Sequence, residues 1–215
     1  MTPTRGEVFI VSSPSGGGKT TMIRRVMELL RDEGRDAHFS ISHTTRPPRA
    51  CERHGVDYFF VDRNEFEAMV GRGEFLEYAE VHENYYGTSR GQVEDRIARG
   101  CDVFLDIDVQ GARQVRASVE DAVKVFVFAP SYAELKRRLV TRRQDDEQTI
   151  RLRLSNAVKE MREYAEFDFV IINTCLDDAV RALASIVAAA RMRPFRVRAD
   201  VQAILEDFER ALKEE

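Results

Sequence analysis

The sequence predicts an α/β protein with a doubly wound, parallel five-stranded sheet, an inserted mixed α/β lobe and a helical lid. Three observations favour this class: short apolar runs with the length of buried strands, helical patterns between them, and a glycine-rich turn after the first run. Strands of a parallel sheet are buried on both faces, so they appear as continuous apolar runs. Ligands of such sheets bind beyond the carboxyl ends of the strands, and the site is therefore expected there.

Four apolar runs fit buried parallel strands, and a fifth candidate is weaker. The four clear runs are residues 8–11, 103–107, 123–129 and 169–172. Residues 39–42, Phe-Ser-Ile-Ser, alternate apolar and polar side chains and form the weaker candidate. Helical patterns separate the runs, as parallel neighbours require, because each connection must cross back to the other end of the sheet.

The turn after the first run has the features of a phosphate-binding P-loop. Residues 12–20 read Ser-Ser-Pro-Ser-Gly-Gly-Gly-Lys-Thr, and an amphipathic helix follows them. Glycines let the backbone curl so that several N–H groups point at one anion, and the helix N-terminus adds the positive end of its dipole. Lys19 is then expected to reach the terminal phosphates of a nucleotide, and the Thr20 hydroxyl is expected to hold Mg²⁺. Ser13 departs from the usual pattern, which begins with glycine.

Two acids close the run at residues 103–107. Asp106 and Asp108 alternate with apolar neighbours, so both are expected to point to one face. A carboxylate on a buried strand needs a partner, and two of them are difficult to explain as structure alone.

A rigid loop with two arginines follows the weaker strand candidate. Residues 43–49, His-Thr-Thr-Arg-Pro-Pro-Arg, contain adjacent prolines, which fix φ and exclude helix. Arg46 and Arg49 lie three residues apart in this loop and suit an anion.

The rest of residues 42–90 reads as a small lobe outside the parallel sheet. Residues 58–61 and 75–81 are predicted strands around a short helix, and residues 83–89 look like a turn.

A pair of helices with arginines on the outer face follows the strand at residues 123–129. Residues 132–143 form the first helix, residues 144–147 interrupt the pattern, and the second helix begins there. Such a hairpin resembles a mobile lid over phosphates. A solvated basic face is the alternative, and the P-loop upstream favours the lid.

The composition favours a cytoplasmic globular protein without a nucleic-acid or membrane partner. Lys+Arg 33 and Asp+Glu 37 give a net charge of −4, which argues against a general nucleic-acid binder. The cysteines, Cys51, Cys101 and Cys175, have no metal-ligand spacing and are expected to be reduced. The longest apolar run, residues 182–190, is too short to cross a bilayer. A last amphipathic helix over residues 201–212 packs either on the domain or on a second copy of the chain, which would make a homo-oligomer.

Together these segments resemble one family, the guanylate kinases, which make GDP from GMP and ATP. The resemblance extends from about residue 8 to about residue 192. It depends on segments in the expected order: SPSGGGKTT, SHTTRPPRACERHGVDYFF, GEFLEYAEVHENYYGTS, DVFLDIDVQG and the R-L-x-x-R of the lid. It implies ATP and GMP (or dGMP) as substrates, Mg²⁺ as cofactor, and in-line transfer of a phosphoryl group.

The resemblance also implies roles for individual residues. The ATP-binding positions are those of the P-loop: Ser13, Pro14, Ser15, Gly16, Gly17, Gly18, Lys19, Thr20 and Thr21. The residues expected to meet the transferring phosphoryl group are Lys19, Arg46, Arg138, Arg142 and Arg153. The GMP-binding positions are Ser42, Arg46, Arg49, Glu52, Tyr58, Glu77, Tyr86, Thr88 and Asp108. The metal positions are Thr20 and Asp106.

The chemistry of guanine supports the role of Glu77. Guanine carries N1–H and a 2-amino group on one edge, so a buried carboxylate can accept hydrogen bonds from both. Adenine has no donor at either place and would leave the carboxylate desolvated and unpaired. Such a site rejects the wrong base by about 10⁴ or more.

The family pattern divides the single domain into three parts. The core is expected to comprise residues 1–41, 91–136 and 155–215, the GMP-binding lobe residues 42–90, and the lid residues 137–154.

The sequence departs from the family pattern in several places, and two other functions stay open. Cys51 and Arg143 stand where glycine is usual, and Asn173-Thr174-Cys175 replaces an Asn-Asp-Asp-like segment, which leaves the adenine-side contacts near Asn173 open. One alternative function is a kinase for another nucleoside monophosphate. The other is a non-catalytic binding module of guanylate kinase-like fold, against which the intact Lys19 and Thr20 argue.

Overall fold

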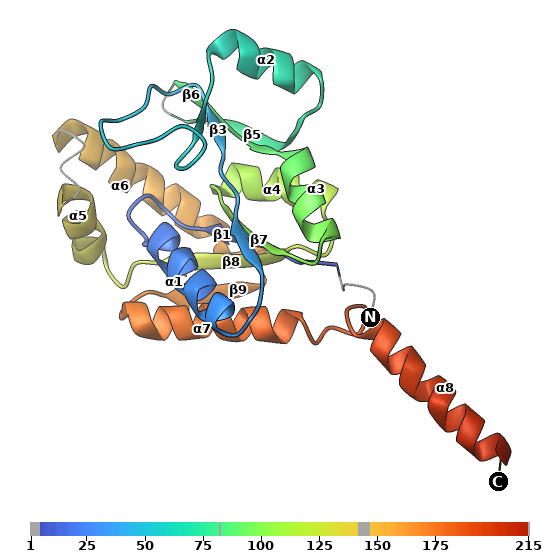
Figure 1. Cartoon of the computed structure of the whole chain (residues 1–215). Coiled ribbons are helices and arrows are strands. Elements are labelled where there is room, and N and C mark those ends of the chain that lie inside the picture. The colour runs from blue at the N-terminus through green and yellow to red at the C-terminus, as the bar shows by residue number, and fades with distance from the viewer. Residues whose placement is uncertain (1–4, 82, 142–146, 215) are drawn as a thin grey trace.

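The computed structural model of the chain describes residues 5–81, 83–141 and 147–214. Within these residues it contains a five-stranded sheet and a four-stranded sheet, with helices packed around them (Figure 1). None of the described helices is both long enough and apolar enough to cross a membrane.

The larger sheet is parallel throughout, with the strand order β2-β7-β1-β8-β9. Its strands are β1 (Val8–Ser12), β2 (Ala37–Phe39), β7 (Asp102–Asp106), β8 (Val123–Phe128) and β9 (Phe169–Ile172). The predicted parallel five-stranded sheet is therefore confirmed, with β1 and its P-loop at the centre.

The fifth strand was misplaced by the sequence pattern. Strand β2 ends at Phe39, and His43–Thr44 forms β3 of the smaller sheet. The predicted run over residues 39–42 spans the point at which the chain leaves one sheet for the other, so its alternation does not belong to a single strand.

Helices cover both faces of the larger sheet. Phe9 and Val11 of β1 belong to one core cluster, with residues of α1 (Lys19–Asp32) and α7 (Leu176–Ala190). Val8 and Ile10 belong to a second core cluster, on the opposite face, with residues of α3 (Arg90–Ala98) and α4 (Val109–Ser118). The alternation of side chains along β1 thus explains the doubly wound arrangement.

The smaller sheet has the order β4-β3-β6-β5, and its core consists of Phe66, Met69 and Phe75. Its elements are β3 (His43–Thr44), β4 (Phe59–Phe60), α2 (Arg63–Gly71), β5 (Phe75–Val81) and β6 (Asn84–Ser89). The predicted turn over residues 83–89 was wrong, because residues 84–89 are strand β6, which pairs antiparallel with both β5 and β3. The turn is limited to the region of Glu83, which has a φ of 65°.

Two packed helices lie between β8 and β9. Helix α5 (Tyr132–Thr141) contributes Leu135 and Leu139 to a cluster with Leu154 and Ala157 of α6 (Glu147–Met161). A 3₁₀ turn, η1 (Arg162–Glu166), leads from α6 to β9.

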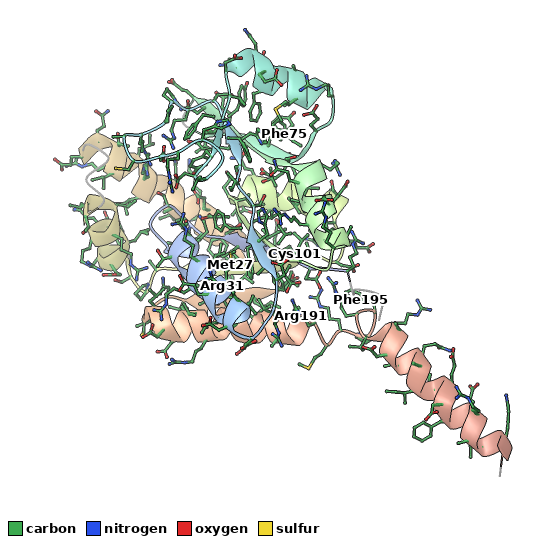
Figure 2. All side chains as sticks on the ribbon, viewed as in Figure 1. Met27, Arg31, Phe75, Cys101, Arg191 and Phe195 are labelled. Atoms are coloured by element: carbon green, nitrogen blue, oxygen red, sulfur yellow. The ribbon has the colours of Figure 1, made fainter. Side chains whose placement is uncertain are left out.

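The last helix, α8 (Arg198–Glu214), projects away from the rest of the chain (Figure 1). Residues 198–213 are all exposed, so α8 does not pack on its own domain. The segment before it is anchored by buried acids: Arg191 lies 2.7 Å from Asp102, and Arg196 lies 2.7 Å from Glu7. Figure 2 shows Arg191 and Phe195 between the body of the protein and α8.

Candidate active site

A cavity of about 700 Å³ is lined by the P-loop, the small lobe, the carboxyl end of β7 and helix α6. Most of the residues that the sequence predicts for the site line it: Ser13, Pro14, Ser15, Gly16, Gly17, Gly18, Lys19, Thr20, Ser42, Arg46, Arg49, Glu52, Tyr58, Glu77, Tyr86, Asp106, Asp108 and Arg153. Thr21, Thr88 and Arg138 are not among the lining residues. Arg142 lies outside the described residues.

The P-loop leads from the buried end of β1 into α1, and its glycines determine its shape. Gly16 and Gly18 have φ values of 90° and 94°, a backbone conformation that residues other than glycine rarely adopt. Gly18 is also the residue before α1, so the free N–H groups of the first helical turn begin beside the cavity. The loop is therefore shaped for an anion, as the sequence predicts.

Two oppositely charged residues beside the P-loop, Lys19 and Asp106, lie next to each other. The Lys19 ammonium donates to the Ser13 carbonyl at 2.9 Å and lies 3.5 Å from Oδ1 of Asp106. The Thr20 hydroxyl donates to Oδ2 of Asp106 at 2.5 Å. Thr21, by contrast, is exposed on α1.

These contacts bear on the predicted magnesium site. Within the described residues, no group of three or more His, Cys, Asp and Glu side chains could hold a metal ion. Mg²⁺ in kinases usually needs only one or two protein oxygens, because phosphate oxygens and water complete its shell. The adjacent oxygens of Thr20 and Asp106, beside the P-loop, fit that arrangement.

Two of the arginines predicted for the lid, Arg138 and Arg153, contact the P-loop. Arg153 of α6 donates from Nη1 to the Ser15 hydroxyl at 3.1 Å. Arg138 of α5 donates from Nη1 to the Gly17 carbonyl at 3.3 Å and from Nη2 to the Asn173 carbonyl at 3.1 Å. Arg138 thus approaches the loop from the side away from the cavity.

The two arginines of the rigid loop lie at the other end of the cavity. Arg46 donates from Nη2 to both carboxylate oxygens of Glu52, at 2.8 and 2.9 Å, and the Arg49 N–H donates to Oε2 at 2.9 Å. The sequence did not indicate this pairing, in which Glu52 orients arginines. The Arg46 guanidinium carbon is 5.4 Å from the ring centroid of Tyr58, and the Tyr58 and Tyr86 rings are 6.0 Å apart. Burial raises the pKa of Tyr58 above its ordinary value of 10, so its hydroxyl is a hydrogen-bond donor at neutral pH.

Glu77 is the most deeply buried acid of the cavity. It is only 4% exposed, and its Oε1 accepts a hydrogen bond from the Thr88 hydroxyl at 2.5 Å. Burial raises the pKa of Glu77 to about 7, against an ordinary value of 4.5. Asp108, another of the predicted GMP-binding residues, accepts from the Gly111 N–H at 2.8 Å and so caps α4. Thr88 is fully buried and reaches the cavity only through Glu77.

Several residues that line the cavity were missed by the sequence reasoning. On α6 they are Asn156, Lys159 and Glu160, and on α4 the residue is Gln110. Asn156 and Glu160 follow Arg153 by three and seven positions, the spacing of one helix face, so helical periodicity could have indicated them. Burial raises the pKa of Glu160, and the charge of nearby Lys19 opposes that rise.

Comparison with known proteins identifies the family. The family model described as guanylate kinase matches residues 5–190. The chain belongs to the guanylate kinase family.

Among similar members of the guanylate kinase family are curated bacterial proteins that cover most of this chain. The guanylate kinase of Salmonella typhimurium (strain LT2) is 48% identical over 192 residues, which is 89% of this chain and 92% of that protein. The guanylate kinase of Escherichia coli (strain K12) is 47% identical over 192 residues, which is again 89% of this chain and 92% of that protein. A solved structure, the guanylate kinase from Anaplasma phagocytophilum, superposes with a TM-score of 0.74 at 31% identity and covers 90% of each chain.

Proposed function

We propose that the protein is an ATP-dependent guanylate kinase that converts GMP and dGMP to GDP and dGDP. The observation that carries this proposal is a single cavity with a P-loop at one end and a buried acid, Glu77, at the other. Membership of the guanylate kinase family supports it.

The acceptor nucleotide would occupy the end formed by the small lobe. The carboxylate of Glu77 would accept from guanine N1–H and the 2-amino group, with Ser42 and Asp108 beside it. Arg46 and Arg49 would hold the GMP phosphate, and the hydroxyls of Tyr58 and Tyr86 would add donors. Hydrogen bonds from Nη2 to Glu52 and from Nη1 to the Pro47 carbonyl orient the Arg46 guanidinium before the substrate arrives.

The donor nucleotide would lie at the P-loop end. Backbone N–H groups of residues 15–20 would hold the ATP phosphates, and Lys19 would turn from the Ser13 carbonyl toward them. Thr20 and Asp106 would hold Mg²⁺ together with phosphate oxygens. Bound there, Mg²⁺ supplies positive charge against the charge that develops on the donor phosphates.

The transfer would need positioning rather than a strong base. The GMP phosphate is already anionic, so the chain contributes alignment of the two nucleotides and charge stabilisation by Lys19, Arg46 and the lid arginines, Arg138, Arg142 and Arg153. We assign the core to residues 1–41, 91–136 and 155–215, and expect the lobe (42–90) and the lid (137–154) to close over the substrates and exclude water.

Acceptor specificity tests the proposed function. ADP release in a coupled assay with ATP and Mg²⁺ is measured with GMP, dGMP, AMP, CMP and UMP supplied separately. Turnover confined to GMP and dGMP is expected. Turnover of another nucleotide would favour a different nucleoside-monophosphate kinase, and GMP binding without turnover would favour a binding module.

Two expectations about the setting of the protein stay predictions. The chain is expected to act in the cytoplasm. The sequence left open whether the last helix packs on a second copy, and the exposed apolar residues of α8 favour such a homo-oligomer: Val201, Ile204, Leu205, Phe208 and Leu212. Sedimentation of the full chain and of a variant that ends at residue 197 tests this second expectation, because loss of α8 should yield a monomer.

A further inference from the structure

Asn173 lies directly after β9, where its side chain meets the P-loop. It is 3% exposed, and its Nδ2 donates to the Gly17 carbonyl at 3.0 Å across 156 positions of sequence. Its Oδ1 is buried without a partner among the described residues, so the contact with Gly17 is the only hydrogen bond that this side chain makes there. The Asn173 N–H donates to the Phe128 carbonyl at 2.8 Å, which fixes the residue to β8.

The same Gly17 carbonyl receives a second donor. Arg138 reaches it from Nη1 at 3.3 Å, and Nη2 of Arg138 donates to the Asn173 carbonyl at 3.1 Å. Asn173, Gly17 and Arg138 therefore form a closed triangle of contacts between β9, the P-loop and helix α5.

The geometry of the peptide bond shows what this triangle does. In a trans peptide the C=O of one residue and the N–H of the next point in opposite directions. Donors that hold the Gly17 carbonyl away from the cavity therefore turn the N–H of Gly18 toward it. That N–H belongs to the segment that would surround the phosphates of a nucleotide.

Gly18 shows how closely Asn173 approaches this peptide. A Cβ built on Gly18 would lie 2.5 Å from Nδ2 of Asn173, and the φ of Gly18 is 94°. Only glycine at this position lets the amide of Asn173 reach the loop.

We propose that Asn173 is a positioning residue that holds the Gly17–Gly18 peptide in the orientation that binds phosphate, with Arg138 of the lid as the second donor to the same carbonyl. Asn173 would act on the triphosphate of any nucleotide through the backbone rather than by contact with the base. The inference rests on the proposed function for its assignment of the P-loop to ATP, but its test requires no turnover of GMP.

The experiment compares a nucleotide with a ligand that has no base. Affinities of wild type, Asn173→Ala and Asn173→Asp for Mg·ATP and for inorganic triphosphate are measured by calorimetry, together with GMP affinity and the thermal midpoint. Asn64→Ala, which truncates an exposed asparagine of α2 that does not line the cavity, provides the matched control. Loss of one buried donor is expected to raise Kd about tenfold for Mg·ATP and for triphosphate alike. GMP affinity should be unchanged, and so should all values of Asn64→Ala.

Asn173→Asp keeps the shape of the side chain but places an acceptor against the Gly17 carbonyl. Its loss of affinity for Mg·ATP and triphosphate should therefore be at least as large as that of Asn173→Ala. If Asn173→Ala does not fold, the affinities of Asn173→Asp test the proposal instead. Loss of ATP affinity without loss of triphosphate affinity would make Asn173 a base contact and overturn the proposal. Lower thermal midpoints with unchanged triphosphate affinity of the folded protein would make Asn173 a purely structural residue, which overturns it as well. A wild type that binds triphosphate but does not phosphorylate GMP would refute the proposed function alone.

Discussion

The hydroxyl of Thr88 donates to Oε1 of Glu77 at 2.5 Å, inside a site where Glu77 is only 4% exposed. One carboxylate oxygen is thus oriented by the protein, and Oε2 lies on the side of Gly111. A buried carboxylate held in this way is prepared for ligand donors, but burial resists its ionisation and raises its pKa to about 7.

Guanosine affinity should rise with pH because of Glu77. Below about pH 7 the folded protein holds this group protonated, and a protonated carboxyl presents its own O–H to one of the two guanine donors. Kd for guanosine should therefore fall as pH rises from about 5.5 to about 8.5. Guanosine is used because it lacks the phosphate of GMP, which itself titrates near pH 6. Glu77→Gln should give a flat profile, and a wild-type profile equally flat would contradict the assignment.

The raised pKa of Glu77 also predicts that stability falls with rising pH, whereas guanosine affinity rises. The folded protein binds the Glu77 proton more tightly than the unfolded chain does, since the pKa is about 7 against 4.5. The contribution of Glu77 to the free energy of unfolding should therefore decrease as pH rises between those values. Urea denaturation of wild type and Glu77→Gln across this range should show a difference that grows toward low pH in favour of wild type.

Glu77→Gln should also weaken the selection of guanine. The neutral amide loses charge-assisted acceptance from both guanine donors and no longer leaves an unpaired charge when adenine binds. The ratio of kcat/KM for GMP over AMP is expected to fall by about 10² or more. If this ratio does not change, the base is read elsewhere in the cavity.

A side chain at Gly111 should displace Glu77. A Cβ there would lie 2.5 Å from Oε2 of Glu77 and 3.1 Å from its Cδ. Gly111→Ala is expected to raise KM for GMP about tenfold or more while KM for ATP stays unchanged. Gly91, a helical glycine whose added Cβ would meet nothing within 4 Å, supplies the control variant Gly91→Ala. Equal KM values for the two variants would remove the steric argument.

Lys19→Ala should abolish most of the turnover while the fold is retained. Lys19 is bound only to the Ser13 carbonyl and to Asp106 in the described structure, contacts that the loop can lose without exposing the core. A drop in kcat of about 10² or more is expected, with an unchanged thermal midpoint. Lys136→Ala, an exposed lysine of α5, provides the control. Near-normal turnover of Lys19→Ala would exclude its role on the phosphates.

The P-loop and the parallel sheet were predictable because their signals are local. The glycines, Lys19 and Thr20 are consecutive, and four of the five strands of the larger sheet lie in mainly apolar runs. Strand β2 (Ala-His-Phe) lacks such a run and was misplaced. Strand β6 was not predictable from the sequence. Residues Asn84–Ser89 are of turn-forming types, and their extended form depends on pairing with β5 and β3.

Contacts between distant segments also escaped prediction. The hydrogen bond from Asn173 to Gly17 joins residues that are 156 positions apart in sequence, and no motif or spacing in the chain predicts it. The cavity-facing residues of α6 continue to Glu160, past the predicted end of the lid at residue 154, because a helix keeps one face toward the cavity along its length.

The central place of β1 has a consequence for the dynamics of the molecule. Its backbone is hydrogen-bonded to β7 on one edge and β8 on the other, and Phe9, Ile10 and Val11 are completely buried. The amide protons of β1 should therefore exchange with solvent only when the whole domain unfolds. The loop proposed to receive the donor nucleotide is thus attached to a strand that should exchange only on global unfolding. Local fluctuations in the smaller sheet or in helices α5 and α6 can leave that attachment intact between one turnover and the next.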